Sequence, residues 1–112
     1  MDLGRIYYID RLETKGRVTG SDHYFVDSFT ISYSSDGQTP FARVIDENGE
    51  TIVFWGNTDG EDLADNTFEP GLTAQYVQLH PVGWENSISL RWEIYGCLGM
   101  TSDVYVHLKK VM

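Results

Sequence analysis

Apolar and polar side chains alternate along much of the chain, and this pattern predicts β-strands. Between residues 28 and 33 every second side chain is apolar, and the side chains between them carry hydroxyl groups. Between residues 87 and 95 the apolar face holds Ile88, Leu90, Trp92 and Ile94. A repeat of two residues is that of a strand with one buried face. We therefore expect strands near residues 5–15, 24–33, 41–45, 51–55, 74–80 and 87–96.

Turn-forming residues separate these stretches and suggest how the strands connect. The dipeptides Asp36-Gly37 and Asn48-Gly49 favour tight turns, because these residue types tolerate a positive φ angle. Asn48-Gly49 is expected to join the two strands that flank it in a hairpin. Residues 56–73 are rich in glycine, asparagine and aspartate, and we expect one long loop there. Many short strands separated by turns predict an all-β sandwich or barrel.

The order of the strands also predicts which loops lie together. If consecutive strands run antiparallel, the connecting loops alternate between the two ends of the fold. Loops 16–23, 46–50 and 81–86 would then share one end. Loops 34–40 and 56–73 would share the other end with Cys97.

The composition is that of one globular domain with an acidic surface. Of the 112 residues, 41% are hydrophobic, 17 are acidic and 8 are Lys or Arg, which gives a net charge of −9. A nucleic-acid binder needs a basic face, so this charge argues against DNA or RNA as a partner. It also argues against docking on anionic lipid by charge alone. Apolar runs are short throughout, so neither a transmembrane helix nor a signal peptide is expected in this chain.

From Asp2 onward the chain carries motifs at the spacing of a known family. In chain order they are Asp2-Leu3-Gly4, Ser34-Ser35-Asp36-Gly37, Phe54, Gly56-Asn57-Thr58-Asp59, Asn66, Phe68, Pro70, Ala74-Gln75-Tyr76-Val77-Gln78-Leu79-His80-Pro81, Trp84 and Ile88-Ser89-Leu90-Arg91-Trp92-Glu93-Ile94-Tyr95-Gly96-Cys97. Over residues 2–97 the chain resembles a discoidin domain. This domain type forms the C domains of coagulation factors V and VIII and the b domains of neuropilin.

The resemblance implies a jelly-roll-like antiparallel β-sandwich of the discoidin, or galactose-binding-like, type. The domain is expected to span residues 1–97, and residues 98–112 are expected to form a C-terminal tail that can add an edge strand. Discoidin domains begin upstream of the Asp-Leu-Gly motif, so the chain is expected to be N-terminally truncated and to lack the first strands. The family's final cysteine pairs with an opening one, so the disulfide partner of Cys97 is expected upstream. The only cysteine here is Cys97, which excludes an internal disulfide.

The resemblance implies two candidate ligand-binding loops, residues 17–24 and residues 81–86. Loop 16–24 aligns with a ligand-contacting hairpin that carries bulky apolar residues in lipid-binding members. The tip of this loop is polar here, which argues against phosphatidylserine insertion, because burying such groups in hydrocarbon is costly. Hydroxyl, carboxylate and imidazole groups suit a glycan or a peptide, and a plain soluble turn is the alternative. The candidate residues are Arg17, Thr19, Gly20, Ser21, Asp22, His23, Tyr24, Trp84, Glu85 and Asn86.

Trp84 has two interpretations, and both stay open at this point. A tryptophan ring stacks well on the C–H face of a sugar and is a common anchor in binding sites. A family tryptophan can equally pack into the core of the sandwich.

Metal binding and catalysis find little support in the sequence. The acidic segment 59–65 lacks the glycine placement of an EF-hand loop, so we expect a solvated loop there. The three histidines have no metal-ligand spacing with the cysteine. Asp22, His23 and Ser28 supply the residue types of a catalytic triad without its sequence context. We expect no metal, no cofactor and no enzymatic activity.

The sequence therefore predicts a non-catalytic extracellular or cell-surface adhesion module. Its expected partner is a cell-surface glycan or an extracellular protein or peptide. An alternative is an incomplete assembly domain with no ligand of its own, which forms a homodimer through an open sheet edge or through Cys97. Phosphatidylserine binding is a third, weaker alternative.

Overall fold

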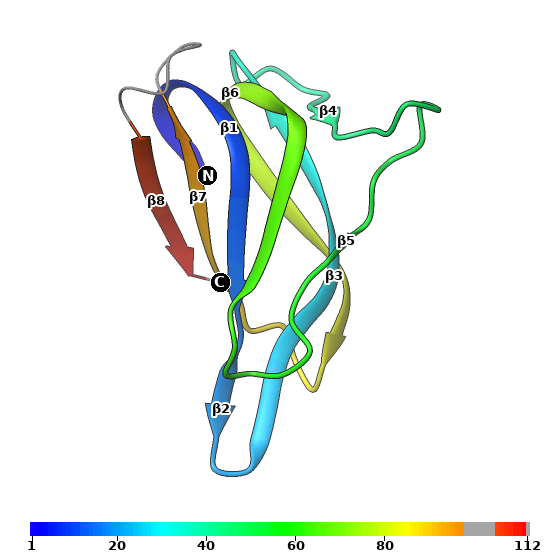
Figure 1. Cartoon of the computed structure of the whole chain (residues 1–112), viewed down its shortest axis with the longest axis vertical. Helices are drawn as coiled ribbons and strands as arrows, with labels where there is room; N and C mark the ends of the chain where they lie inside the picture. The colour runs from blue at the N-terminus through cyan, green and yellow to red at the C-terminus, as the bar shows by residue number, and fades with distance from the viewer. Residues whose placement is uncertain (98–104, 112) are drawn as a thin grey trace.

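The computed structural model describes residues 1–97 and 105–111, with residues 68–69 and 105–111 described by their backbone alone. This part of the chain is antiparallel β-structure (Figure 1), which confirms the predicted all-β class. The described residues contain no helix that could cross a membrane. The strands are β1 (Asp2–Lys15), β2 (Arg17–Thr19), β3 (Asp22–Ser34), β4 (Ala42–Arg43), β5 (Phe54–Trp55), β6 (Ala64–Glu85), β7 (Arg91–Cys97) and β8 (Tyr105–Val111).

The long strand β6 folds back on itself, and this bend creates the two layers. Residues 64–76 pair with β1, whereas residues 76–85 pair with β3, so Tyr76 pairs with both. A straight strand of 22 residues would be about 70 Å long, but the longest dimension of the molecule is 43 Å. One residue, Gly16, separates β1 from β2, which pairs with the start of β3. Both ends of β6 therefore return to the same end of the molecule.

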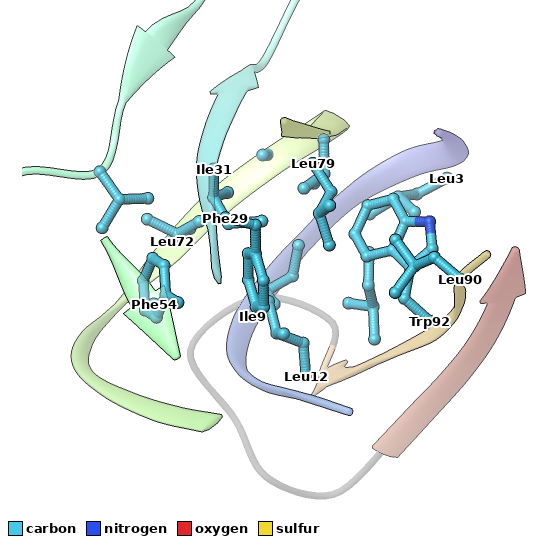
Figure 2. Packing of buried hydrophobic residues seen from close by; sticks show 14 of the residues in the cluster. Leu3, Ile9, Leu12, Phe29, Ile31, Phe54, Leu72, Leu79, Leu90 and Trp92 are labelled. Atoms are coloured by element: carbon cyan, nitrogen blue, oxygen red, sulfur yellow. The ribbon is translucent and has the colours of Figure 1, made fainter. Parts of the chain in front are cut away.

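The two layers enclose one hydrophobic core. The first layer has the order β8–β7–β1 followed by the first half of β6. The second layer pairs the other half of β6 with β3, which also pairs with the short strands β4 and β5. Figure 2 shows Trp92 and Leu90 near β7 and Phe29 and Phe54 on the opposite side of the same cluster. The fold is thus the expected β-sandwich.

The bend in β6 also changes which residues face the core. Leu72 and Ala74 are buried before the bend, and Val77 and Leu79 are buried after it. Inward positions are even-numbered in the first half and odd-numbered in the second. A register irregularity opposite this part of β1 accommodates the change.

The prediction of one long loop over residues 56–73 is wrong for its second half. Residues 64–73 belong to β6 and pair with β1. Their composition hides the strand, because it is polar and contains Pro70-Gly71. That dipeptide lies where the register with β1 shifts, so proline's missing N–H interrupts no regular ladder.

The predicted hairpin turn at Asn48-Gly49 is present, but it forms an excursion between β4 and β5, each of which pairs with β3. Ile45 and Thr51 form a β-bridge across the turn, and Gly49 has a φ of +82°. β4 and β5, on either side of this excursion, both run antiparallel to β3 and therefore continue in one direction along it. The predicted assignment of loops to ends is therefore wrong here. Loop 56–63 lies at the same end as loop 16–23.

The final predicted strand begins later than expected. β7 starts at Arg91, and Ile88 is 43% exposed rather than in the core. Leu90, Trp92 and Ile94 are buried as predicted.

The C-terminal tail contributes one described strand. In the tail 98–112, residues 98–104 and 112 lie outside the described residues. β8 pairs with β7 and has no second neighbour among the described strands.

Candidate ligand-binding end

Three segments meet at one end of the sandwich, which we call the hairpin end. They are the β2–β3 hairpin (residues 17–24), loop 56–63 and the segment 84–90, all in the lower part of Figure 1. The hairpin pairs Arg17 with Tyr24 and Thr19 with Asp22. Its two-residue turn begins at Gly20, whose φ of +65° is a conformation that favours glycine. Thr19, Gly20, Ser21 and Asp22 are all exposed at the tip.

His23 fastens the other two segments to the hairpin. Its Nδ1 atom accepts a hydrogen bond of 3.0 Å from the backbone N–H of Gly60. Its backbone carbonyl accepts a hydrogen bond of 2.6 Å from the side-chain amide of Asn86. His23 and Asn86 therefore hold the loops in place. The sequence predicted ligand binding for these two residues, and the structure adds this positioning role.

Loop 56–63 is also anchored by Asn57, near its first residue. The amide Nδ2 of Asn57 donates to the carbonyl oxygens of Thr14 (3.0 Å) and Asp62 (2.8 Å). Gly60 packs so tightly on the hairpin that an added Cβ would lie 2.2 Å from the carbonyl oxygen of Arg17. Hydrogen bonds from the backbone N–H groups of Asp62 and Glu61 lower the pKa of Asp59. These contacts fix loop 56–63 in position against the hairpin.

Arg17 and Tyr24 form a second pair on the hairpin. The Arg17 guanidinium lies 4.5 Å from the centre of the Tyr24 ring, which is a cation–π contact. The exposed carboxylates of the three segments are those of Asp22, Glu61, Asp62 and Glu85. The hairpin end is therefore mainly acidic, with one arginine placed over an aromatic ring.

Trp84 lies at the surface of this end. It pairs with Val26 in register and is 47% exposed. This exposure favours the surface interpretation over the core one, and Trp92 is the buried tryptophan instead. Glu85 and Asn86 follow it and are exposed.

The predicted residues come together, and the sequence analysis missed others nearby. The hairpin residues and Trp84–Asn86 share the hairpin end, as predicted. Loop 56–63 was assigned to the wrong end. Trp55, which pairs with Ser28 on β3, is 75% exposed, because the strand alternates and Phe54 takes the inward position. That alternation in the sequence is the signal that could have identified Trp55.

The groups considered for catalysis do not form a triad. The His23 ring nitrogen Nδ1 is bonded to the backbone of Gly60, and the Ser28 hydroxyl donates to Asp27. Among the described residues, no group of three or more His, Cys, Asp or Glu side chains is arranged to hold a metal ion.

Comparison with known proteins decides the family. The family model of the F5/8 type C domain matches residues 1–94. The chain belongs to the F5/8 type C domain family. This confirms the resemblance to discoidin domains that the motifs suggested.

Individual relatives of this F5/8 type C domain are distant in sequence and much longer. Neuropilin-1 of Xenopus laevis is 34% identical over 99 residues, which are 87% of this chain and 10% of that protein. Neurexin-4 of Drosophila melanogaster is 32% identical over 105 residues, 94% of this chain and 8% of that protein. The solved structure of discoidin II of Dictyostelium discoideum has a TM-score of 0.69 and 29% identity over 87% of this chain and 35% of that one. The chain thus spans 10% or less of the length of these two curated relatives.

Cys97 is a buried thiol at the end of β7 and is 8% exposed. The structure gives no support to a disulfide at this position.

Proposed function

We propose that this F5/8 type C domain is a non-catalytic recognition module of an extracellular or cell-surface protein. It binds a glycan or a protein segment at the hairpin end. Thr19, Ser21 and Asp22 supply hydrogen-bonding groups at the hairpin tip, and Trp84 supplies an aromatic face. Arg17, Tyr24 and Glu85 line the same end, and Gly20, His23 and Asn86 hold its loops in position.

One observation carries this proposal. His23 joins the hairpin to loop 56–63 and to Asn86 through two hydrogen bonds. Loops that are already fastened lose little conformational entropy when a ligand binds, so the exposed groups they carry are preorganised. A half-exposed tryptophan at the same end of the sandwich as short hydroxyl side chains suits a sugar or a peptide.

The hairpin tip also supports a polar ligand over a bilayer. Thr19, Ser21 and Asp22 would have to enter hydrocarbon without partners if the hairpin inserted into a membrane. The exposed carboxylates of the hairpin end would further repel anionic headgroups. Membrane insertion is therefore disfavoured on both grounds.

The test is a glycan array and a cell-surface binding assay on the chain and its variants. Trp84→Ala and Asp22→Ala should each weaken binding about tenfold or more, because each removes an exposed anchor group. Ile45→Ala is the matched control, since Ile45 is also an exposed hydrophobic residue but lies at the base of the turn 46–50, away from the hairpin end. Equal binding by the chain and by both hairpin-end variants would contradict the choice of site.

Vesicles test the lipid alternative separately. Cosedimentation with liposomes should not increase when phosphatidylserine replaces phosphatidylcholine. An increase that Asp22→Ala strengthens would support membrane binding instead of the proposed function.

The burial of Cys97 bears on the assembly alternative. A thiol with 8% exposure is poorly placed to bond with a second chain unless the end of β7 opens. Reaction of native protein with a thiol reagent should therefore be slow and should become fast in denaturant. A dimer that dissociates only with reductant would instead favour assembly through Cys97.

A further inference from the structure

A hollow lies at the end of the sandwich opposite the hairpin end. It is an open hollow with a volume of about 350 Å³, which is within the usual range of small-molecule sites. Its walls come from the end of β3, the connection 35–41, β4 and Thr73 of β6. β3 starts in the hairpin at Asp22 and ends here at Ser34, so the length of that strand separates this hollow from the hairpin end.

The connection that forms the outer wall is held in place. Gly37 packs on the Tyr76 ring, where an added Cβ would lie 3.2 Å from ring carbons. Phe41 lies on the same ring, with centroids 6.4 Å apart and a tilt of 55° between the ring planes. Because Gly37 and Phe41 both rest on Tyr76, the wall between them exists before any ligand arrives.

Asp36 places a fixed carboxylate at this hollow. Its Oδ1 atom accepts hydrogen bonds from the Ser34 hydroxyl (3.1 Å) and from the backbone N–H of Gln38 (2.9 Å). These hydrogen bonds lower the pKa of Asp36, so the group is ionised at neutral pH. Both bonds fall on one oxygen, which leaves Oδ2 without a partner among the described residues.

The remaining lining supplies both donors and acceptors. The amide of Gln38 and the hydroxyls of Thr39 and Thr73 line the hollow, and none has a side-chain hydrogen-bond partner among the described residues. Tyr33 and Ala42 contribute apolar surface beside them. Hydroxyl-bearing ligands match this set, because a hydroxyl donates to a carboxylate and accepts from an amide. A cation would need more acceptors, and an anion would meet the Asp36 carboxylate.

We propose that this hollow is a binding site for a neutral sugar unit, separate from the hairpin end. Asp36 Oδ2 accepts from one sugar hydroxyl, and Gln38, Thr39 and Thr73 bond neighbouring hydroxyls. Tyr33 and Ala42 pack on the C–H groups of the ring. A single shallow site of this kind binds with millimolar affinity and gains strength when several copies act together.

The test is an NMR titration of the whole chain with glucose, galactose, mannose and N-acetylglucosamine. At least one sugar should shift the backbone amides of Gln38, Thr39, Ala42 and Thr73 in a saturable way. Asp36→Asn should weaken that sugar about tenfold or more, because a hydrogen bond to a charged acceptor is lost. Asp46→Asn is the matched control, since Asp46 also caps its own turn through two backbone N–H groups but lies outside the hollow.

A second variant guards against a folding effect in Asp36→Asn. Ala42→Trp fills the hollow from the exposed strand β4 without removing a side-chain hydrogen bond, and it should abolish the shifts while the rest of the spectrum is retained. Each sugar is tested at up to about 100 mM, which is on the order of ten times a weak dissociation constant. The absence of shifts with all four sugars at that concentration would overturn the proposal. Shifts confined to residues 17–24 would also overturn it. Trp84→Ala should leave the sugar titration of the hollow unchanged, so this proposal and the proposed function can fail independently.

Discussion

Asn57 shows how one buried side chain holds a whole loop. It is almost fully buried, and its Nδ2 atom donates to Thr14 on β1 and to Asp62 within loop 56–63. Its backbone N–H donates to Val26 of β3. One residue thereby connects the loop to both layers of the sandwich.

Asn57→Ala should lower the free energy of unfolding by about 2 kcal/mol, because two carbonyl oxygens lose their donor inside the protein. Asn66→Ala is the matched control, since its amide makes one exposed hydrogen bond to Trp55 and its loss should cost less than about 1 kcal/mol. Urea denaturation of the three proteins measures both values. Equal destabilisation by the two substitutions would contradict the anchoring role.

His80 is the residue through which pH should act on stability. Burial, followed by the nearby Arg43 cation, lowers the pKa of His80 below its ordinary value of 6.5. Its Nε2 atom lies 2.7 Å from the Ser32 hydroxyl, and Arg43 donates to Thr30 on the same strand. The unfolded chain therefore takes up the proton first as the pH falls.

A lowered histidine pKa stabilises the fold above pH 6.5 and loses this stabilisation as pH falls toward the pKa of the folded state. His80→Gln should remove this part of the pH dependence while keeping a polar partner for Ser32. The difference in melting temperature between pH 7.5 and 5.5 should be smaller in His80→Gln than in the parent protein. An NMR titration that finds the pKa of His80 above 6.5 would refute the assignment.

At the scale of elements, the tight contact between loop 56–63 and the hairpin decides the shape of the hairpin end. Gly60 lies directly against the backbone of Arg17, and its N–H reaches His23. No strand pairing joins these two segments. Their packing therefore depends on the absence of a side chain at residue 60.

Gly60→Ala should displace the loop and shift the backbone amide signals of residues 17–24, because its Cβ would collide with a carbonyl oxygen. Gly49→Ala is the comparison variant, since Gly49 has a φ of +82° but open space around it. It should cost about 1 kcal/mol through backbone strain and leave the signals of residues 17–24 unchanged. Unchanged hairpin signals in Gly60→Ala would show that this contact does not shape the site.

At the scale of the whole molecule, stability comes from the core between the layers. Trp92 is the largest fully buried side chain and packs with Leu90 and Leu3 near β7 (Figure 2). Trp55 is 75% exposed on the second layer. Two tryptophans thus occupy opposite extremes of burial in one small domain.

Trp92→Ala should lower the free energy of unfolding by about 3–5 kcal/mol, because it leaves a large cavity in the core. Trp55→Ala should change the free energy of unfolding by about 0.5 kcal/mol or less. Chemical denaturation followed by circular dichroism compares the two variants. If Trp92→Ala proves too unstable to purify, Trp92→Phe should fold and show an intermediate loss. Equal stability of Trp55→Ala and Trp92→Ala would contradict the placement of the core.

The sequence by itself determined the local features of this protein. Alternation identified the strands around Ile31 and Trp92, because the side chains of a strand point to opposite faces wherever it lies. Asn48-Gly49 identified its turn, because a positive φ is a property of single residues. The motifs also identified the family and both candidate segments of the hairpin end.

Only the tertiary structure decided how these parts meet. Residues 64–73 are mostly polar, and their composition alone does not predict a strand. They form one because β1 supplies a pairing partner. The fold of β6 on itself and the shared direction of β4 and β5 place loop 56–63 beside His23. The hollow at Asp36 depends on Tyr76, which is far from it in sequence. Local conformation follows from neighbouring residues, but these contacts join residues that are distant along the chain, so they exist only when the layers pack.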